Sequence, residues 1–155
     1  MKFFIRYSVG KNCIIRSGVS IGGQGFGFNL DKLGEQNRKS FIGGVILEDG
    51  VEIGCNSAVA AGSIESTVLR SGVKLDNLVH IGHDCILGEK SILAAGVSLS
   101  GYVVAGRSVR FAPNSTVRQR VTIGDNVLVG MGAAVLRNVK QDSVVFGNPP
   151  KLLKS

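Results

Sequence analysis

Residues 79–99 read VHIGHDCILGEKSILAAGVSL, and this stretch sets the pattern for most of the chain. An apolar residue recurs in it at every sixth position. The spacing extends in both directions without a break, through Leu69, Leu75, Ile81, Leu87, Leu93, Leu99, Ala105, Phe111, Val117, Ile123, Val129 and Val135. A period of six matches neither an α-helix nor simple strand alternation. It fits a short flat strand followed by a corner, repeated along the chain.

A second class of residues, small or β-branched, follows four positions after each of these apolar residues. Its members are Val73, Val79, Cys85, Ser91, Val97, Val103, Val109, Ser115, Val121, Val127, Ala133 and Val139. Glycine often comes directly after the apolar residue, as at Gly82, Gly88, Gly106, Gly124 and Gly130. We expect both classes to point inward, with glycine or a small residue taking the special backbone angles of the corner.

The first part of the chain keeps the same period in two other registers. Val9, Ile15 and Ile21 form one set, and Leu47, Ile53 and Val59 form the other. A long interruption from about residue 27 to 46 separates the two sets, and a four-residue slip follows at 65–68. Three six-residue sides close a triangular coil, so 18 such units predict an all-β parallel β-helix of about six triangular coils.

The domain organisation expected from this pattern is a single β-helix domain over residues 1–155, with a C-terminal tail at about 141–155. The interruption at 27–46 is too long for a plain turn, so it predicts one projecting loop. That loop either covers the site of a neighbouring subunit or is a mobile excursion without a role.

Composition indicates which partners and which cellular compartment suit the protein. A net charge of +7 suits anionic partners, such as nucleic acid, phosphorylated small molecules or a membrane surface. The three cysteines are odd in number and form no CxxC pair, which favours a reduced, cytoplasmic protein over a disulfide framework. No stretch is long enough to cross a bilayer, and the apolar run at the start is too short for a signal peptide.

Short motifs add a family resemblance. GQGFGF at 23–28 and GVKLDNLVHIGH at 72–83 resemble UDP-3-O-acylglucosamine N-acyltransferase of lipid A synthesis. HDCILG at 83–88 and GNPPK at 147–151 are similar to the nucleotide-sugar N-acetyltransferases. Both groups are hexapeptide-repeat acyltransferases. The resemblance implies a left-handed β-helix, a homotrimer with its sites in grooves between subunits, and His83 as the catalytic base.

Several departures separate the chain from the lipid A enzyme. An Asp-Arg pair of that enzyme is Ala60-Ala61 here, and its second histidine falls near Arg120. Its N-terminal uridine-binding domain and helical C-terminal extension also have no counterpart in the repeats. We therefore expect an acetyl-CoA-dependent N-acetyltransferase acting on a nucleotide-linked amino sugar. Sugar O-acetylation and transfer of a longer acyl chain, from CoA or an acyl carrier protein, are the alternatives.

The 18-residue coil places His83, Gly101, Gln119 and Arg137 along one edge, about one strand spacing apart. His83 would take the proton of the attacking group, and the Gly101 amide would donate to the oxyanion. Asp84 either orients His83 or is a solvated turn carboxylate. For the CoA phosphates, Arg120, Arg137, Lys140 and Lys151 are the candidates, beside Gln119. For the sugar they are Asp76, Asn77 and His80, each of which is otherwise a corner or structural residue.

Other classes of function fit less well. A zinc hydratase on this fold needs three histidine ligands, and the chain has two, so we expect no metal. An ice-binding solenoid presents regular threonine arrays, and Thr occurs at positions 67, 116 and 122 alone. A non-enzymatic scaffold leaves the His83 and Gly101 column unexplained. We expect neither nucleic acid nor stable membrane insertion among the partners.

Overall fold

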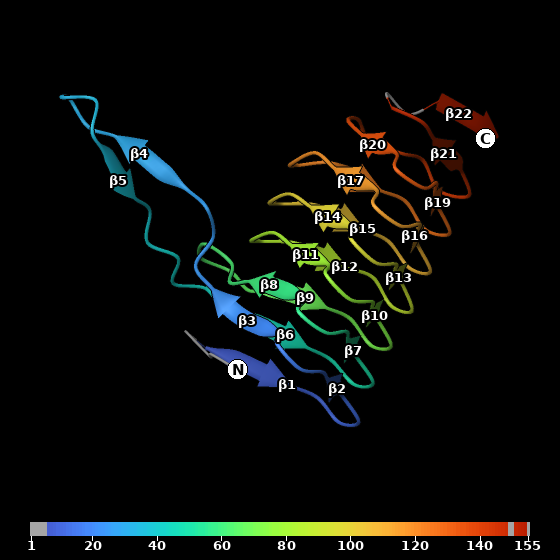
Figure 1. Ribbon diagram of the computed structural model, residues 1–155, viewed down its shortest axis with the longest axis horizontal. Helices are drawn as coiled ribbons and strands as arrows, with labels where there is room; N and C mark the ends of the chain where they lie inside the picture. The colour runs from blue at the N-terminus through green and yellow to red at the C-terminus, as the bar shows by residue number, and fades with distance from the viewer. Residues whose placement is uncertain (1–5, 149–150, 155) are drawn as a thin grey trace.

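The computed structural model describes residues 6–148 and the backbone of residues 151–154. Short strands wind into a stack of three-sided coils that runs from the N-terminal to the C-terminal end (Figure 1). Side A contains β3 (Ser20–Gly23), β8 (Ala58–Ala60), β11 (His80–Ile81), β14 (Ser98–Leu99), β17 (Thr116–Val117) and β20 (Ala134–Val135). Side B contains β1 (Tyr7–Val9), β6 (Val45–Leu47), β9 (Thr67–Leu69), β12 (Ile86–Leu87), β15 (Val104–Ala105) and β18 (Thr122–Ile123).

Side C completes the triangle. It contains β2 (Ile14–Ile15), β7 (Glu52–Ile53), β10 (Lys74–Leu75), β13 (Ile92–Leu93), β16 (Arg110–Phe111), β19 (Leu128–Val129), β21 (Val144–Phe146) and β22 (Lys151–Lys154). The strands of all three sides pair in parallel, except that β22 runs antiparallel to β21. The expected tail at 141–155 therefore contains two strands of side C.

The register of the coils follows the predicted 18-residue step. His80 pairs with Ser98, and Thr116 pairs with Ala134, so one coil separates the partners. Backbone hydrogen bonds of 2.8–3.2 Å join the coils next to the strands, as between His80 N and Val97 O at 2.9 Å. Backbone polar groups in the interior of the stack are therefore satisfied by the coils on either side.

The core is the stack of inward-facing residues. All twelve positions predicted from Leu69 to Val135 are at most 3% exposed. The second class is buried as well, apart from Val139, which is half-buried. Val9 differs from the prediction, because it is 41% exposed although it pairs with Leu47. It lies in the first described coil, where no further described coil covers it.

The corners use glycine differently from what was predicted. Gly82, Gly88, Gly106, Gly124 and Gly130 do not have a positive φ. They are needed for close approach, since a Cβ on Gly82 would lie 2.7 Å from the amide nitrogen of Gly101 in the next coil. The left-handed conformation falls mostly on other residues, among them Asp84, Tyr102 and Arg120 with φ of 59°, 61° and 62°. Such angles are costly for a residue with a Cβ, so the ladder on both sides must impose them.

Both breaks in the repeat lie at the corner between side A and side B, which we call the A/B corner. The first is a hairpin of β4 (Phe28–Leu30) and β5 (Gln36–Arg38), which projects from the solenoid (Figure 1). The second is an insertion at 61–66, between β8 and β9. The slip predicted at 65–68 is thus earlier than expected, because Thr67 and Val68 already belong to β9 and pair with β6. Similarly, β6 begins at Val45, inside the range predicted for the loop.

Core packing gives a matched test on two neighbouring residues of β13. Leu93 is fully buried, whereas Ile92 is 44% exposed. We expect Leu93→Ala to lower the free energy of unfolding by about 2–5 kcal/mol, because it leaves a cavity in a close-packed interior. Ile92→Ala should change it by less than about 1 kcal/mol. Urea unfolding followed by circular dichroism measures both, and equal losses would contradict the inward assignment of Leu93.

Candidate functional site

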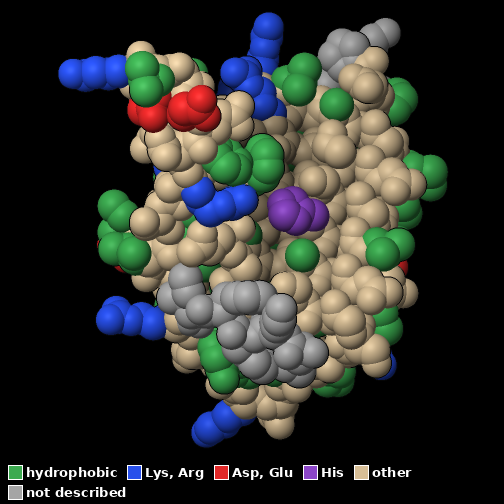
Figure 2. Space-filling model, turned by 60° about the vertical axis from the view of Figure 1, so that its left-hand side comes forward, with side chains coloured by type: hydrophobic (Ala, Val, Ile, Leu, Met, Phe, Trp, Pro, Cys, Tyr) green, Lys and Arg blue, Asp and Glu red, His purple; other side chains and the backbone are tan. Residues whose placement is uncertain are grey.

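The candidate site lies at the A/B corner, on the C-terminal side of both breaks in the repeat. His83 follows β11 there, one coil beyond the insertion at 61–66. Figure 2 shows histidine at the surface of one face of the molecule, with Lys and Arg side chains nearby. The two irregular segments of an otherwise regular solenoid are therefore stacked directly before the coil that carries His83.

His83 is paired with its neighbour in sequence. Its Nδ1 lies 2.7 Å from Oδ2 of Asp84, and the two side chains are 21% and 9% exposed. The other carboxylate oxygen, Oδ1, accepts hydrogen bonds from the amide of Ser63 at 2.8 Å and from its hydroxyl at 3.0 Å. The Asp84 amide donates to Thr67 Oγ1 at 2.9 Å. An ionised carboxylate can only accept, so Nδ1 is the donor in this contact, and Nε2 of the neutral imidazole carries a lone pair.

Two aromatic rings hold the imidazole between them. Phe41 and Tyr102 both contact it edge to face, with ring centroids 5.1 Å and 5.0 Å from that of His83. Phe41 comes from the segment that returns from the hairpin, and it is 3% exposed. Gly25 makes room for this packing, because a Cβ there would lie 2.5 Å from the Phe41 ring and 2.9 Å from Cδ2 of His83.

Gly101 lies against the reactive edge of the ring. A Cβ on Gly101 would be 2.6 Å from both Cε1 and Nε2 of His83, so a side chain is excluded at this position. The Gly101 amide has no hydrogen-bond partner within the described part of the chain. The site thus places a ring nitrogen with a lone pair beside a backbone whose N–H group is free to bind a ligand.

The polar and cationic residues of this edge lie at the A/B corner of the coils after His83. Gln119 follows β17 and Arg137 follows β20 at the same offset at which His83 follows β11, and both are exposed. Arg120 stacks over Tyr102, with its guanidinium carbon 4.6 Å from the ring centroid. Lys140 is exposed on the coil of Arg137. Lys151 belongs to β22, and its side chain lies outside the described residues.

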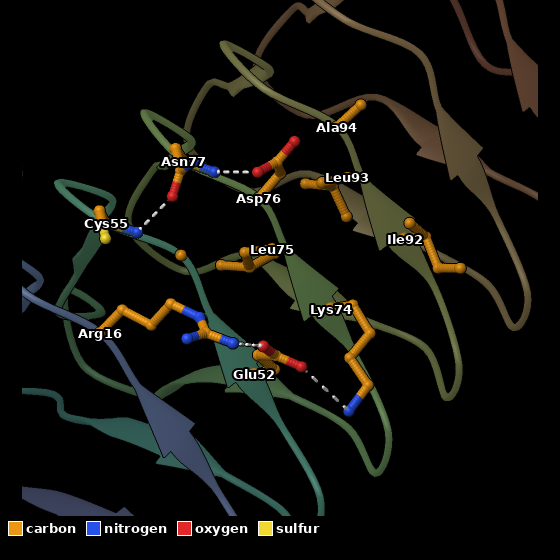
Figure 3. Close-up of a pocket in the computed structure, with 11 residues that line it drawn as sticks. Arg16, Glu52, Cys55, Lys74, Leu75, Asp76, Asn77, Ile92, Leu93 and Ala94 are labelled. Carbon is orange, nitrogen blue, oxygen red and sulfur yellow. Dashed lines mark hydrogen bonds and ion pairs between the residues drawn. The ribbon is translucent and has the colours of Figure 1, made fainter.

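Of the three residues expected at the sugar, Asp76 and Asn77 lie at a different corner from His83 within one chain. Asp76 and Asn77 form the corner between sides C and A, where Asp76 Oδ1 accepts from the Asn77 amide and Asn77 Oδ1 from the Cys55 amide, each at 2.7 Å (Figure 3). His80 is a strand residue of β11, not a corner residue, and partial desolvation lowers its pKa.

Asp76 and Asn77 line an open groove of about 590 Å³. Its floor carries a charge ladder, in which Glu52 pairs with Arg16 at 2.7 Å and with Lys74 at 3.9 Å (Figure 3). Ile92 and Leu93 close the other side of the groove. This groove and His83 lie at two different corners of the triangle.

Cys85, although next to Asp84, takes no part in the surface chemistry. It points into the core, and burial raises the pKa of its thiol to about 12. Its Sγ donates to the carbonyl oxygen of Ser100 at 3.1 Å. A thiol held protonated in this way is a poor nucleophile, so Cys85 does not form a reactive Cys–His pair with His83.

Residues 6–148 contain no group of three or more His, Cys, Asp or Glu side chains placed to hold a metal ion. No helix in the described part of the chain is long and apolar enough to cross a membrane.

Three contributors to the site were not predicted from sequence. Phe41 lies in the interruption at 27–46, and nothing in the period indicates that it returns to His83. Ser63 lies in the insertion, where the repeat assigns no position. Tyr102 is detectable in principle, because it lies one coil after Asp84 in the 18-residue column.

Comparisons with known proteins agree with this architecture. Residues 114–137 match the family model described as the hexapeptide repeat of succinyl-transferase. The probable UDP-3-O-acylglucosamine N-acyltransferase 2, mitochondrial, of Arabidopsis thaliana is 36% identical over 142 residues, which are 92% of this chain and 47% of that protein. The chain spans less than half the length of the curated relatives it matches.

Solved structures show the same fold. LpxA from Acinetobacter baumannii superposes with a TM-score of 0.79 at 20% identity, covering 96% of this chain and 62% of that one. The chain is a hexapeptide-repeat β-helix protein. This confirms the predicted left-handed parallel β-helix of about six coils and the resemblance to the hexapeptide-repeat acyltransferases. A perosamine N-acetyltransferase from Caulobacter crescentus, in complex with CoA and GDP-perosamine, superposes less closely, with a TM-score of 0.54 at 24% identity over 97% of this chain and 58% of that one.

The contact of Gly101 with His83 predicts the effect of a single methyl group. In Gly101→Ala, the Cβ would overlap the His83 ring, so the ring must leave its position and the bond to Asp84 is weakened. We expect the side-chain NMR resonances of His83 to shift while those of His80 stay in place. Gly23→Ala is the control, because a Cβ there meets nothing closer than 3.8 Å. Unchanged His83 resonances in Gly101→Ala would contradict the packing.

Burial of Cys85 predicts slow thiol labelling. In a Cys13→Ser/Cys55→Ser variant, we expect no reaction of the native protein with a thiol reagent at pH 8, because the remaining thiol is buried and protonated. After unfolding in guanidinium, one thiol per chain should react. Rapid labelling of the folded variant would show that Cys85 reaches solvent.

Proposed function

We propose that this protein transfers an acyl group from a thioester to the amino group of a nucleotide-linked amino sugar, with His83 as the general base. The observation that carries the proposal is the contact of His83 with Asp84 at 2.7 Å on one side and with the Gly101 backbone on the other. In the neutral imidazole, such a pair leaves Nε2 without a proton beside a free N–H donor. Acyl transfer to an amine requires these two groups and no covalent intermediate on the protein.

The proposed reaction has two steps. The amine attacks the thioester carbonyl while His83 Nε2 accepts one of its protons, so that a C–N bond forms and the carbonyl oxygen becomes an oxyanion. The Gly101 amide donates to this oxyanion. The C–S bond then breaks, and the imidazolium returns its proton to the leaving thiolate. The Asp84 carboxylate stabilises the imidazolium between the two steps.

The donor is a thioester of CoA or of an acyl carrier protein. We favour acetyl-CoA, whose phosphates would meet Arg120, Arg137, Lys140 and Lys151, with Gln119 beside the pantetheine arm. The names of the curated relatives, which are N-acyltransferases acting on UDP-3-O-acylglucosamine, support a longer acyl chain as the alternative. The basic column serves either donor, because both carry phosphate.

The acceptor is held by residues from two chains in this proposal. Asp76 and Asn77 lie at another corner from His83, so they serve the same site if a neighbouring subunit presents that corner to it. This agrees with the homotrimer that the family resemblance implies. His80, three residues before His83, would contact the sugar from the same chain.

Thiol-release kinetics test the proposal. Acetyl-CoA, longer acyl-CoA thioesters and acyl carrier protein thioesters would be offered with UDP-, dTDP- and GDP-linked amino sugars. We expect turnover with at least one pair, and a loss of about 100- to 10,000-fold in kcat for His83→Ala, because general-base catalysis contributes on this order. His80→Ala is the matched control, and its effect should fall on KM.

Each outcome has a distinct meaning. Wild-type kcat in His83→Ala with an accepted sugar would show that His83 is not the base. Turnover of a sugar hydroxyl but of no amine would replace N-acylation by O-acylation. Absence of thiol release with every pair would refute the acyltransferase function and leave the scaffold class.

A further inference from the structure

The insertion at 61–66 breaks a period that the rest of the solenoid keeps. The inward residues Val59 and Leu69 on its two sides are ten positions apart, whereas Ile81 and Leu87 at the same corner one coil later are six apart. Ala61 is buried, but no residue of the insertion belongs to the interior cluster, and the ladder passes directly from β8 and β9 to β11 and β12. The role of the insertion must therefore lie at the surface of the corner.

The insertion has a fixed conformation. Gly62 and Gly43 both lie against the carbonyl oxygen of Glu65 so closely that a Cβ on either would collide with it. Backbone hydrogen bonds tie it to the segment returning from the hairpin, from Gly62 N to Gly44 O at 3.1 Å and from Ile42 N to Ser63 O at 3.0 Å. The insertion is thus built to hold Ser63 in one place.

Ser63 is directed at the carboxylate that orients His83. Its amide and hydroxyl both bind Oδ1 of Asp84, so that Oδ2 is turned toward Nδ1 of His83. The same hydroxyl lies 3.1 Å from the Tyr102 hydroxyl, whose ring contacts the imidazole. Ser63 therefore contacts two of the groups that surround His83, Asp84 and Tyr102, and no hydrogen bond joins it to His83 itself.

We infer that Ser63 is a positioning residue of the His83 site, and that the insertion at 61–66 exists to present it. By binding Oδ1 twice, Ser63 fixes the rotation of the Asp84 carboxylate. That orientation keeps the proton of the neutral imidazole on Nδ1 and leaves Nε2 as the base. The inference rests on the proposed function for its catalytic consequence, but the placement of the proton can be measured without any substrate.

Ser63→Ala removes one of the two hydrogen bonds to Oδ1 and keeps the amide. Ser66→Ala is the matched control, because Ser66 lies in the same insertion and makes no side-chain hydrogen bond within the described residues. In ¹⁵N NMR at a pH where the rings are neutral, we expect wild-type His83 to carry its proton on Nδ1. The Nε2–H form should rise in Ser63→Ala and stay unchanged in Ser66→Ala. Urea midpoints would confirm that both variants are folded.

Kinetics provide the second measurement, with the donor and acceptor pair found by thiol release. We expect Ser63→Ala to lower kcat about tenfold, the size of one charge-assisted hydrogen bond, with KM within about twofold. In an Asp84→Asn background the same substitution should lower kcat by less than about twofold, since its effect passes through the carboxylate.

Two results would overturn the inference. One is an unchanged tautomer and kcat in Ser63→Ala; the other is a full tenfold loss that persists in the Asp84→Asn background. If His83→Ala keeps its kcat while Ser63→Ala still shifts the tautomer, the proposed base is wrong, whereas the positioning of the ring by Ser63 stands.

Discussion

The structure depends on one constraint, the parallel backbone ladder that joins each coil to the next with a step of 18 residues. Because every strand is two to four residues long, no strand is stable alone, and each is held by the strands above and below it. The ladder imposes left-handed backbone angles at corners occupied by Lys90, Tyr102 and Arg120, which would not adopt them by preference. A corner residue in that conformation has its position set by two neighbouring coils.

His83 lies at the A/B corner where the repeat is interrupted in the coils before it and is regular in the coils after it. Before His83, the hairpin and the 61–66 insertion supply Phe41 and Ser63, which the repeat by itself has no means of placing. After His83, unbroken coils supply Gly101, Tyr102 and Arg120 at a fixed spacing. Irregular segments thus enclose the imidazole, while regular ones extend a surface away from it.

The core residues could be predicted from the sequence because inward positions follow the period of six. Every sixth position from Leu69 to Val135 is buried as predicted. The sequence also placed His83, Asp84 and Gly101 correctly beside one another, since an 18-residue step converts sequence distance into stacking. It did not reveal the corner conformations, because Lys90 and Arg120 have no local preference for positive φ and the ladder imposes it. Phe41 and Ser63 escaped prediction for a related reason. Both lie in segments outside the period, whose paths are decided by tertiary contacts.

Corner residues along the edge from His83 to Arg137 are separated by whole coil steps. Three coils separate the two residues, so at about 4.8 Å per coil they are roughly 14 Å apart along the axis. A molecule that reaches both must be extended over this length, and any change in the number of intervening coils alters the distance by a whole step. Under the proposed function, the ligand length that fits this edge would therefore change in whole steps, with the number of repeats between His83 and Arg137.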